Sequence, residues 1–547
     1  MGLGVLEDHK LSHVPGTVLL NDEAAHSESQ TGNLKHGTGK NSHIVLSPQP
    51  SDDPNDPLNW SLLKKESIVW ILAFGSMLCA ATNGPFLNAS YFAIAKQINK
   101  DLTTTVLVSG YNILAIACIG PFVCAFSRRY GKRPVFIVST LFCIVGTAIG
   151  EVKVSYKYLL AARIVQGFST SAFESLIISV VGDLFCVHQR GLRIASINFV
   201  LNSASSLASI ICGQVYNNLG LLWLFHLFQI FLVIQFVLMF FFCPETTYIR
   251  ETIYETDTLQ TETFEQIEKA NDEHREQAIA VKELNEPAAI AAAANPRIPK
   301  KKTFVQELKV YNGHFSQDNI FKWLFGMILT LFNPAGLYVI VVSGLLCAWY
   351  VGSAIILAGI FAGPPWMFDA SQIGYLGTGP FIGVFFLTTL TIPAKPSEPE
   401  FRLIFMLPCA VFSGFGMFFF GYTMAHGSNA ILCAFFQGMM MVGVMIGVVA
   451  TMSYGLDAFR SQSNEIFVMN MVFKNFMFYG LSNFANNWVA AKGPEEIMFT
   501  FGGTTLAMCV FGIPVYIFGK KMRSWWTRHD LFVKFNMQTT GPETHLG

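Results

Sequence analysis

Four polar side chains interrupt an apolar stretch that begins at Tyr158, whose first 28 residues could cross a bilayer as one helix. They are Arg163, Gln166, Thr170 and Glu174, spaced by three, four and four positions. At about 100° per residue, the four side chains share one narrow stripe of the helix. A charge placed in hydrocarbon costs at least about 2.5 kcal/mol, so we expect this stripe to face protein or a water-filled interior.

Arg163 and Glu174 need separate partners, because at about 1.5 Å rise per residue they lie about 16 Å apart along the helix. One interpretation places both on a pathway through the membrane, where a carboxylate can take up and release a proton. In the other, Arg163 extends to the membrane surface and Glu174 is protonated or paired in a structural contact. The general rule for ionisable residues within spans favours the pathway and makes Glu174 the leading candidate for proton coupling or cation binding.

A second polar group interrupts the apolar segment 464–488. Lys474 lies about 15 Å from the start of this segment by helical rise, which is near the middle of a bilayer. Asn475 lies on a neighbouring polar stripe of the same helix. We therefore expect Lys474 and Asn475 to line the pathway; the alternative is that Lys474 extends to the surface or pairs with a structural acid.

The composition predicts a membrane protein. Of 547 residues, 52% are hydrophobic and only 13% are charged, which is too apolar for an ordinary soluble domain. The 36 basic and 36 acidic residues cancel and give no indication of nucleic-acid binding. Nearly all of the 11 cysteines fall within apolar segments, which argues against a disulfide framework and against a metal site. The run GTGK at 37–40 lacks two required residues of a phosphate loop, and no catalytic motif occurs, so we expect neither a cofactor nor an enzyme.

Apolar segments of near 20 residues occur in two series of six. They cover 67–93, 103–126, 134–150, 157–185, 192–216 and 220–243, then 335–360, 371–393, 403–422, 428–452, 464–488 and 495–519. This pattern predicts an all-α membrane protein with twelve transmembrane helices in two six-helix halves. We expect a flexible tail over 1–65, an N-terminal bundle over 66–243, a linker loop over 244–320, a C-terminal bundle with an interfacial lead-in over 321–519, and a second tail over 520–547.

Basic residues concentrate in the loops on one side of these segments. By the positive-inside rule, that side is cytoplasmic and carries both termini and the linker loop. The linker opens with an acidic run and closes with Lys300, Lys301 and Lys302, which we expect to lie against the inner leaflet. Asn88, followed by Ala and Ser, is then a poorly placed candidate for glycosylation. Glycine pairs at 146/150 and 443/447 predict close helix packing within the bundles.

Local sequences between the segments resemble the major facilitator superfamily, and in particular its fungal drug:proton antiporter-like branch. They are DPNDPLNWS (53–61), RRYGKRP (128–134), RIVQG (163–167), DLFCVHQRG (183–191), PETTY (244–248) and EPEFRL (398–403). With AFESL (172–176), the set is most similar to the yeast-type polyamine and histidinol transporter group. The resemblance implies two helical halves that rock around a central site near the bilayer midplane.

The resemblance also implies a cytoplasmic gate built from the loop after the second segment and from the end of the fourth. Its residues are Arg129, Gly131, Arg133, Asp183, Arg190 and Gly191. This chain has Arg128 where the family's loop has an acid and Cys124 where it has its first glycine. Asp183 is therefore the nearest candidate to neutralise Arg129 or Arg133.

Three functions follow as candidates. We expect a monomeric, multi-pass transporter of the plasma membrane that exchanges a small organic solute for protons, in the direction of efflux of drug-like or secondary-metabolite compounds. Uptake of polyamines or other organic cations is the alternative within this class, and Glu174 suits both. A membrane nutrient receptor that does not transport is the candidate from another class. Solute movement in reconstituted vesicles distinguishes transport from reception.

Overall fold

The computed structural model describes residues 5–6, 50–51, 53–82, 84–248, 300–316, 319–389, 399–459, 462–529 and 531–535. Every regular element within these ranges is helical. Most of the tail predicted over 1–65 and the acidic run of the linker lie outside the described residues.

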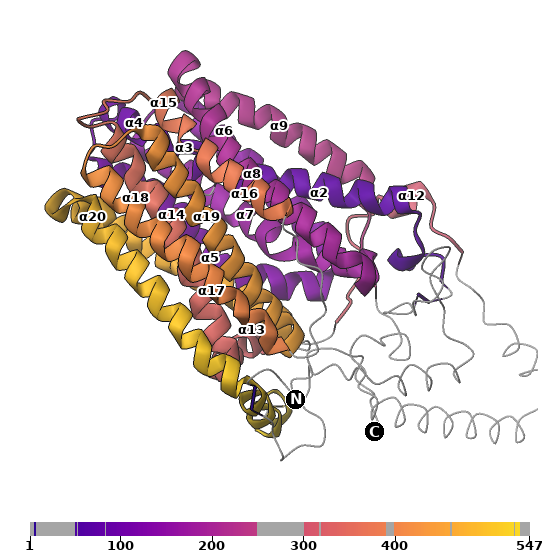
Figure 1. Ribbon diagram of the computed structural model, residues 1–547. Helices are drawn as coiled ribbons and strands as arrows, with labels where there is room; N and C mark the ends of the chain where they lie inside the picture. Colours follow the sequence, from indigo (N-terminus) through magenta and orange to yellow (C-terminus); the bar gives the residue numbers. More distant parts are fainter. Residues whose placement is uncertain are drawn as a thin grey trace, which may run out of the picture.

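Six long helices build the first half of the molecule (Figure 1). They are α2 (Leu62–Thr82), α5 (Leu102–Tyr130), α6 (Lys132–Val152), α7 (Tyr156–Leu184), α8 (Val187–Leu219) and α9 (Leu221–Phe242). Two short helices, α3 (Pro85–Asn88) and α4 (Tyr91–Gln97), stand where the first span was predicted to continue to residue 93. That prediction was wrong because Pro85 has no N–H to continue α2 and instead opens α3.

The second half follows α12 (Phe304–Glu307) and the short apolar helix α13 (Ile320–Leu329). Its helices are α14 (Pro334–Phe361), α15 (Ala370–Tyr375), α16 (Thr378–Thr389), a run from Pro399 to Ala425 that includes α17 (Met406–Cys409) and α18 (Gly416–Ala425), α19 (Ala430–Ala458) and α20 (Ser463–Arg528). Gly493, with a φ of 84°, divides α20 into two spans just before Pro494. Nine helices of the described residues are long and apolar enough to cross a membrane. With α20 counted as two spans, and with α2 and α16, the predicted twelve-helix fold is confirmed.

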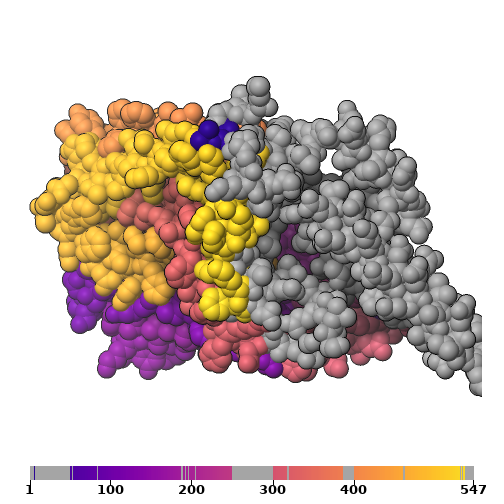
Figure 2. Space-filling model, turned by 90° about the horizontal axis from the view of Figure 1, so that it is seen from below, coloured from indigo at the N-terminus to yellow at the C-terminus, as the bar shows by residue number. Residues whose placement is uncertain are grey.

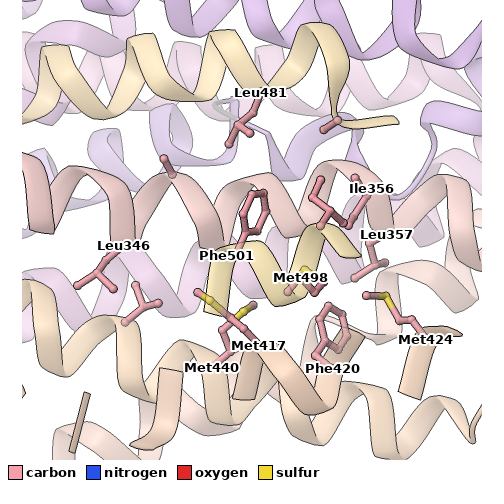
Figure 3. Close-up of a cluster of buried hydrophobic side chains, with 14 of the residues drawn as sticks. Leu346, Ile356, Leu357, Met417, Phe420, Met424, Met440, Leu481, Met498 and Phe501 are labelled. Atoms are coloured by element: carbon pink, nitrogen blue, oxygen red, sulfur yellow. The ribbon is translucent and has the colours of Figure 1, made fainter. Parts of the chain in front are cut away.

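An apolar cluster fills the second half between α14, α18, α19 and α20 (Figure 3). Leu346 extends from α14 towards this cluster, and Met417 of α18 and Met440 of α19 lie next to each other below Phe501. Met417 and Met440 have no exposed surface. Unbranched methionine side chains fill irregular gaps between helices, so these residues serve packing.

The two predicted glycine pairs lie at close helix contacts within the halves. A Cβ atom on Gly146 would lie 2.9 Å from the backbone nitrogen of Gln166 on α7. A Cβ atom on Gly443 would lie 2.1 Å from the backbone nitrogen of Ser413. Because real Cβ atoms do not come this close to backbone, both positions depend on glycine, and the prediction of close packing is confirmed.

Helices of the two halves also lie against each other. In Figure 2, purple segments of the first half lie directly against orange segments of the second half. Between the halves, α5 and α7 contact α20, and α8 contacts α15 and α16. These contacts bring the two polar spans predicted from the sequence, the fourth and the eleventh, to one interface.

Candidate functional site

An ion pair joins the two halves within the membrane-spanning region. Glu174 of α7 contacts Lys474 of α20 through its Oε1 atom. The two side chains keep 18% and 28% of their surface exposed, so the pair is only partly buried. The second carboxylate oxygen, Oε2, has no hydrogen-bond partner among the described residues. The structure therefore brings together one charged candidate from each of the two polar spans.

The rest of the predicted stripe on α7 lies inside the first half. Arg163 and Gln166 have no exposed surface, and Thr170 keeps 1%. Helix α7 packs against α5 and α6 and meets α20 at Glu174. One stripe thus faces two environments, because the neighbouring helix changes along the length of α7.

Neutral hydrogen-bond partners surround the buried Arg163. Its guanidinium donates to Ser109 Oγ at 3.0 Å and to Gln166 Oε1 at 3.2 Å. Gln166 in turn donates to Thr147 Oγ1 at 2.9 Å. The guanidinium also lies 5.4 Å from the ring centre of Phe86. A buried cation whose partners are neutral costs stability, and such residues within spans are functional candidates by default.

Helices α2, α5 and α7 are held together in the two turns of α7 before Glu174. A Cβ atom on Gly167 would lie 2.4 Å from the carbonyl oxygen of Asn112, so α7 approaches α5 closely there. The Asn112 amide donates to the carbonyl of Thr82 at 3.0 Å, and the Thr82 hydroxyl lies 3.2 Å from that of Thr170. These bonds fix the position of α7 and therefore of the carboxylate that it carries towards α20.

The side-chain amides of Asn470 and Asn475 lie close to Lys474 along α20. Asn475 keeps 6% of its surface and Asn470 keeps 9%. The Nδ2 atom of Asn475 and the Oδ1 atom of Asn470 have no hydrogen-bond partner among the described residues. Buried polar groups are normally satisfied, so these amides can bind water or the polar groups of a solute.

We call the end of the bundle that carries Arg128 and Arg129, in the last turn of α5, the basic end. There, a carboxylate that was not predicted binds the start of α6. Glu245 accepts the backbone N–H groups of Lys132 and Arg133 at 3.0 Å each. A carboxylate at a helix N-terminus satisfies free N–H groups and the helix dipole.

Gly131 is required beside this carboxylate. Its φ is +90°, and a Cβ atom would lie 2.4 Å from Glu245 Oε2. Glu245 belongs to the PETTY run, which was recognised as a motif. Its partner Lys132 lies 113 residues away in the sequence, so no local pattern indicates the contact itself.

Asp183 contacts a different cation from those expected. Its carboxylate pairs with Lys132 rather than with Arg129 or Arg133. Arg133 instead donates to four backbone carbonyls, at 2.7 to 3.1 Å, and they belong to Phe240, Cys243, Glu307 and Leu308. The prediction was wrong because the forked guanidinium fits the carbonyls at the end of α9 and in the linker, which leaves the ammonium group of Lys132 to meet the acid.

The remaining gate candidates have separate surroundings. Arg190 donates to the carbonyls of Phe185 and Gly182 at 2.8 Å each and so caps the end of α7. The Arg129 guanidinium lies 5.6 Å from the ring centre of Tyr130. Gly191 lies in α8, and its surroundings are outside what the structure describes. The candidates thus share the basic end of the molecule, and the contacts described above join them to different partners.

Arg128 reaches across to the second half. Its Nη2 atom lies 2.7 Å from Glu465 Oε1 at the start of α20, and its guanidinium lies 4.4 Å from the ring centre of Trp323 on α13. Arg128 thus stands at the loop position where the resembled family has an acid, and its acidic partner, Glu465, belongs to the second half. Glu465 was not predicted, because an acid in the first turn of a helix is common for helix-dipole reasons alone.

The glycosylation candidate is poorly accessible. Asn88 is half-buried in α3, and Ser90 of the same acceptor sequence keeps 1% of its surface. An acceptor sequence has to be exposed, so this geometry does not favour modification in the folded chain.

Comparisons with known proteins agree with this architecture. The family model described as Major Facilitator Superfamily matches residues 69–494. An uncharacterized MFS-type transporter of Schizosaccharomyces pombe is 24% identical over 95% of this chain and 94% of its own length. Protein HOL1 of Saccharomyces cerevisiae is 22% identical over 89% of this chain and 91% of its own. The MFS antiporter QDR3 of Candida albicans is 31% identical over 40% of this chain and 31% of its own.

Two solved structures have a similar fold. The human organic anion transporter MFSD10 matches with a TM-score of 0.51 and 15% identity, over 82% of this chain and 99% of its own. The peptide transporter POT, in complex with alafosfalin, matches with a TM-score of 0.54 and 12% identity, over 83% of this chain and 95% of its own. At these identities the likeness concerns the fold alone.

Proposed function

The chain belongs to the major facilitator superfamily, and we propose that it exchanges a small organic solute for protons, with Glu174 as the group that carries the proton. It is a multi-pass membrane transporter and not an enzyme. The observation that supports the coupling is the ion pair between Glu174 of one half and Lys474 of the other.

Three cations can compete for the Glu174 carboxylate. Lys474 holds it in the structure. A proton removes the charge of the carboxylate and so releases Lys474, and a cationic group of a solute replaces Lys474 directly. Binding of one competitor therefore lowers the affinity for the others, which is the linkage that an antiporter requires. Because Lys474 belongs to the second half, each exchange also makes or breaks a contact between the halves.

The other predicted site residues act around this pair. Arg163, Gln166 and Thr170 are sealed inside the first half, so they position α7 rather than touch the solute. Asn475 is placed to offer its unsatisfied amide to a solute or to water. The gate residues Asp183 and Arg190 act in opening and closing the basic end, so their substitution changes turnover more than solute affinity.

The proposed direction is efflux of drug-like or secondary-metabolite compounds from a plasma membrane, by a monomer whose basic end is cytoplasmic. The similarity to an MFS antiporter over 40% of the chain supports antiport. The gathering of Arg128, Lys132 and Arg133 at one end supports the orientation. Uptake of organic cations is the second candidate, and the free Glu174 Oε2 atom favours it, because that oxygen can accept from an ammonium group.

Glu174→Gln tests the proposal. The purified variant is reconstituted in vesicles, and movement of ethidium and spermidine is followed under imposed pH gradients of either sign. We expect near-complete loss of gradient-driven movement and retained exchange of probe between the two sides, because the amide keeps the shape of the side chain and has no carboxylate to carry a proton. The matched control is Glu496→Gln. It removes an exposed ion pair between Glu496 and Lys492, both on α20, and should leave transport unchanged.

Two outcomes count against the proposal. If Glu174→Gln moves the probes with the rate and pH dependence of the parent, Glu174 is structural and the coupling assignment is wrong. If the parent binds the probes without moving them in either direction, the receptor function from another class is favoured.

A further inference from the structure

The end of the linker is held in a defined conformation at the basic end of the first half. The backbone N–H of Lys302 donates to Asn55 Oδ1 at 2.8 Å, and Asn55 Nδ2 donates to the carbonyl of Lys300 at 3.2 Å. One asparagine side chain thus holds the backbone on both sides of Lys301. The three consecutive lysines are therefore presented on a fixed backbone.

Two side chains of the bundle anchor the helix that follows. The ammonium of Lys64, in the first turn of α2, contacts both carboxylate oxygens of Glu307 on α12 at 2.7 Å. Arg133 of α6 donates to the carbonyls of Glu307 and Leu308. Figure 1 shows α12 beside the end of α2. The segment 300–308 is thereby attached to the ends of two membrane-spanning helices.

The lysines have no acidic partner among the residues that the structure describes. Lys300, Lys301 and Lys302 are exposed and take part in no ion pair there. The acids of the region have other partners: Glu307 binds Lys64, and Asp53 accepts from Asn55 and from the Tyr248 hydroxyl. The surface at 300–302 therefore carries a local excess of positive charge.

Apolar side chains lie next to this charge. Val305 of α12 is 76% exposed, and Leu63, adjacent to the Lys64 anchor on α2, is 83% exposed. Phe304 and Leu62 are more than half exposed as well. A basic group bordered by exposed apolar side chains at the end of membrane-spanning helices is the composition of a segment that lies in a membrane interface.

We propose that residues 300–305 form a docking surface for the anionic headgroups of the adjoining leaflet, with the lysines on the headgroups and Phe304 and Val305 in the outer acyl region. Each lysine near an anionic membrane surface favours binding by roughly a factor of five. The other occupant of suitable charge is the acidic run of the same linker, in which Leu259, Phe264 and Ile267 stand isolated among charged and polar residues. A membrane fits better, because Phe304 and Val305 are exposed together beside the lysines at the ends of membrane-spanning helices. This inference does not depend on the solute or on proton coupling.

The test follows the accessibility of Val305. The full-length Val305→Cys variant is placed in nanodiscs, so that both faces are open to solvent, and reacted with a charged, water-soluble thiol reagent, with the parent's own labelling subtracted. The nanodiscs contain either phosphatidylcholine alone or phosphatidylcholine with phosphatidylserine. We expect phosphatidylserine to slow the labelling by at least about fivefold, and high salt to remove this effect.

Two further variants identify the groups responsible. Replacing Lys300, Lys301 and Lys302 by Gln in the same background should abolish the slowing. The lysine side chains are exposed, and the Asn55 side chain bonds only to the backbone of Lys300 and Lys302, so these bonds are kept. The matched control replaces Lys100, Lys153 and Lys157, which are exposed at the other end of the bundle, and should leave the slowing intact. Equal labelling rates in the two lipid compositions would overturn the proposal. So would slow labelling in phosphatidylcholine alone that salt relieves, because the acidic run of the linker would then be the occupant.

Discussion

Two of the zones in which the halves touch have opposite character. At the end away from the basic end, glycine lets backbones meet: a Cβ atom on Gly213 of α8 would lie 2.5 Å from the carbonyl oxygen of Ala370 on α15. Cβ atoms on Gly374 and Gly377 would likewise lie 2.7 and 2.8 Å from carbonyl oxygens of α8. We call this the glycine zone. Towards the basic end, the contacts include two ion pairs, Glu174 with Lys474 and Arg128 with Glu465, which we call the charged zone.

The difference determines which zone can respond to a ligand. Contact between close-packed backbones is short-ranged, and no proton, ion or solute charge changes it directly. An ion pair acts over a longer distance and changes when either partner is neutralised or bound by a competitor. We therefore expect the charged zone to receive the signal and the glycine zone to open as a consequence, because the halves move as packed units.

The largest expected effect comes from Gly213→Val, which breaks the glycine zone. A side chain at this position must displace the α15 backbone, so the halves cannot close at that end. We expect normal insertion and near-complete loss of transport in vesicles. Gly480→Val is the matched control, because a Cβ atom on this helical glycine of α20 meets nothing within 4 Å. Transport by Gly213→Val at the parental rate would show that closure of this zone is not part of the cycle.

A smaller effect is expected from the basic-end pair. Arg128→Gln leaves Glu465, which is 2% exposed, as a buried carboxylate without its ion-pair partner, whereas Glu465→Gln leaves Arg128 22% exposed and over the ring of Trp323. Removing one partner of a buried pair costs more than removing both. We expect about a tenfold loss of turnover in Arg128→Gln and a few-fold loss in Glu465→Gln.

The double variant decides whether this pair acts as a contact between the halves. Turnover of Arg128→Gln with Glu465→Gln should exceed that of Arg128→Gln alone, because the buried charge is gone. Independent, multiplicative losses would show that the two residues do not act on each other. Solute affinity, measured by binding of the probes in detergent, should stay within a factor of two in all three variants.

The sequence predicted what depends on local pattern. Apolar runs of near 20 residues indicated the spans, and the spacing of Arg163, Gln166, Thr170 and Glu174 indicated one stripe on one helix. It also identified Lys474 as a charge near mid-membrane. The sequence left Lys474 as one of several possible partners of Glu174, and it could not select this pairing, because the pairing depends on how the fourth and eleventh spans pack.

Other misses have equally physical causes. Lys132 and Arg133 are neighbours in the sequence, and the orientation of α6 decides which of them meets Asp183. The glycine zone was not predicted, because Gly213, Gly374 and Gly377 lie on elements that meet only when the two halves are assembled. The end of α2 was visible in Pro85, but the apolar residues after it continued the pattern of a span.

The smallest expected effect concerns the helix that carries part of the glycine zone. Asp369 caps α15: its carboxylate accepts the backbone N–H of Gln372 and the hydroxyl of Ser371, both at 2.8 Å, and these bonds hold the pKa of Asp369 below its usual value of 3.8. A carboxyl with a lowered pKa in the folded protein stabilises it above about pH 4 and loses that contribution as the pH falls through the lowered pKa. Asp369 is therefore ionised throughout pH 5 to 8 and adds no pH dependence there.

Asp369→Ala should cost about 1 kcal/mol of stability through loss of the cap, seen as a slightly lower melting temperature, while Asp369→Asn keeps an acceptor and should melt close to the parent. Both should keep the parental pH profile of transport between pH 5 and 8, where the profile reports the charged zone. A shift of that profile in Asp369→Asn would mean that the glycine zone also senses protons, and the division between the two zones would be wrong.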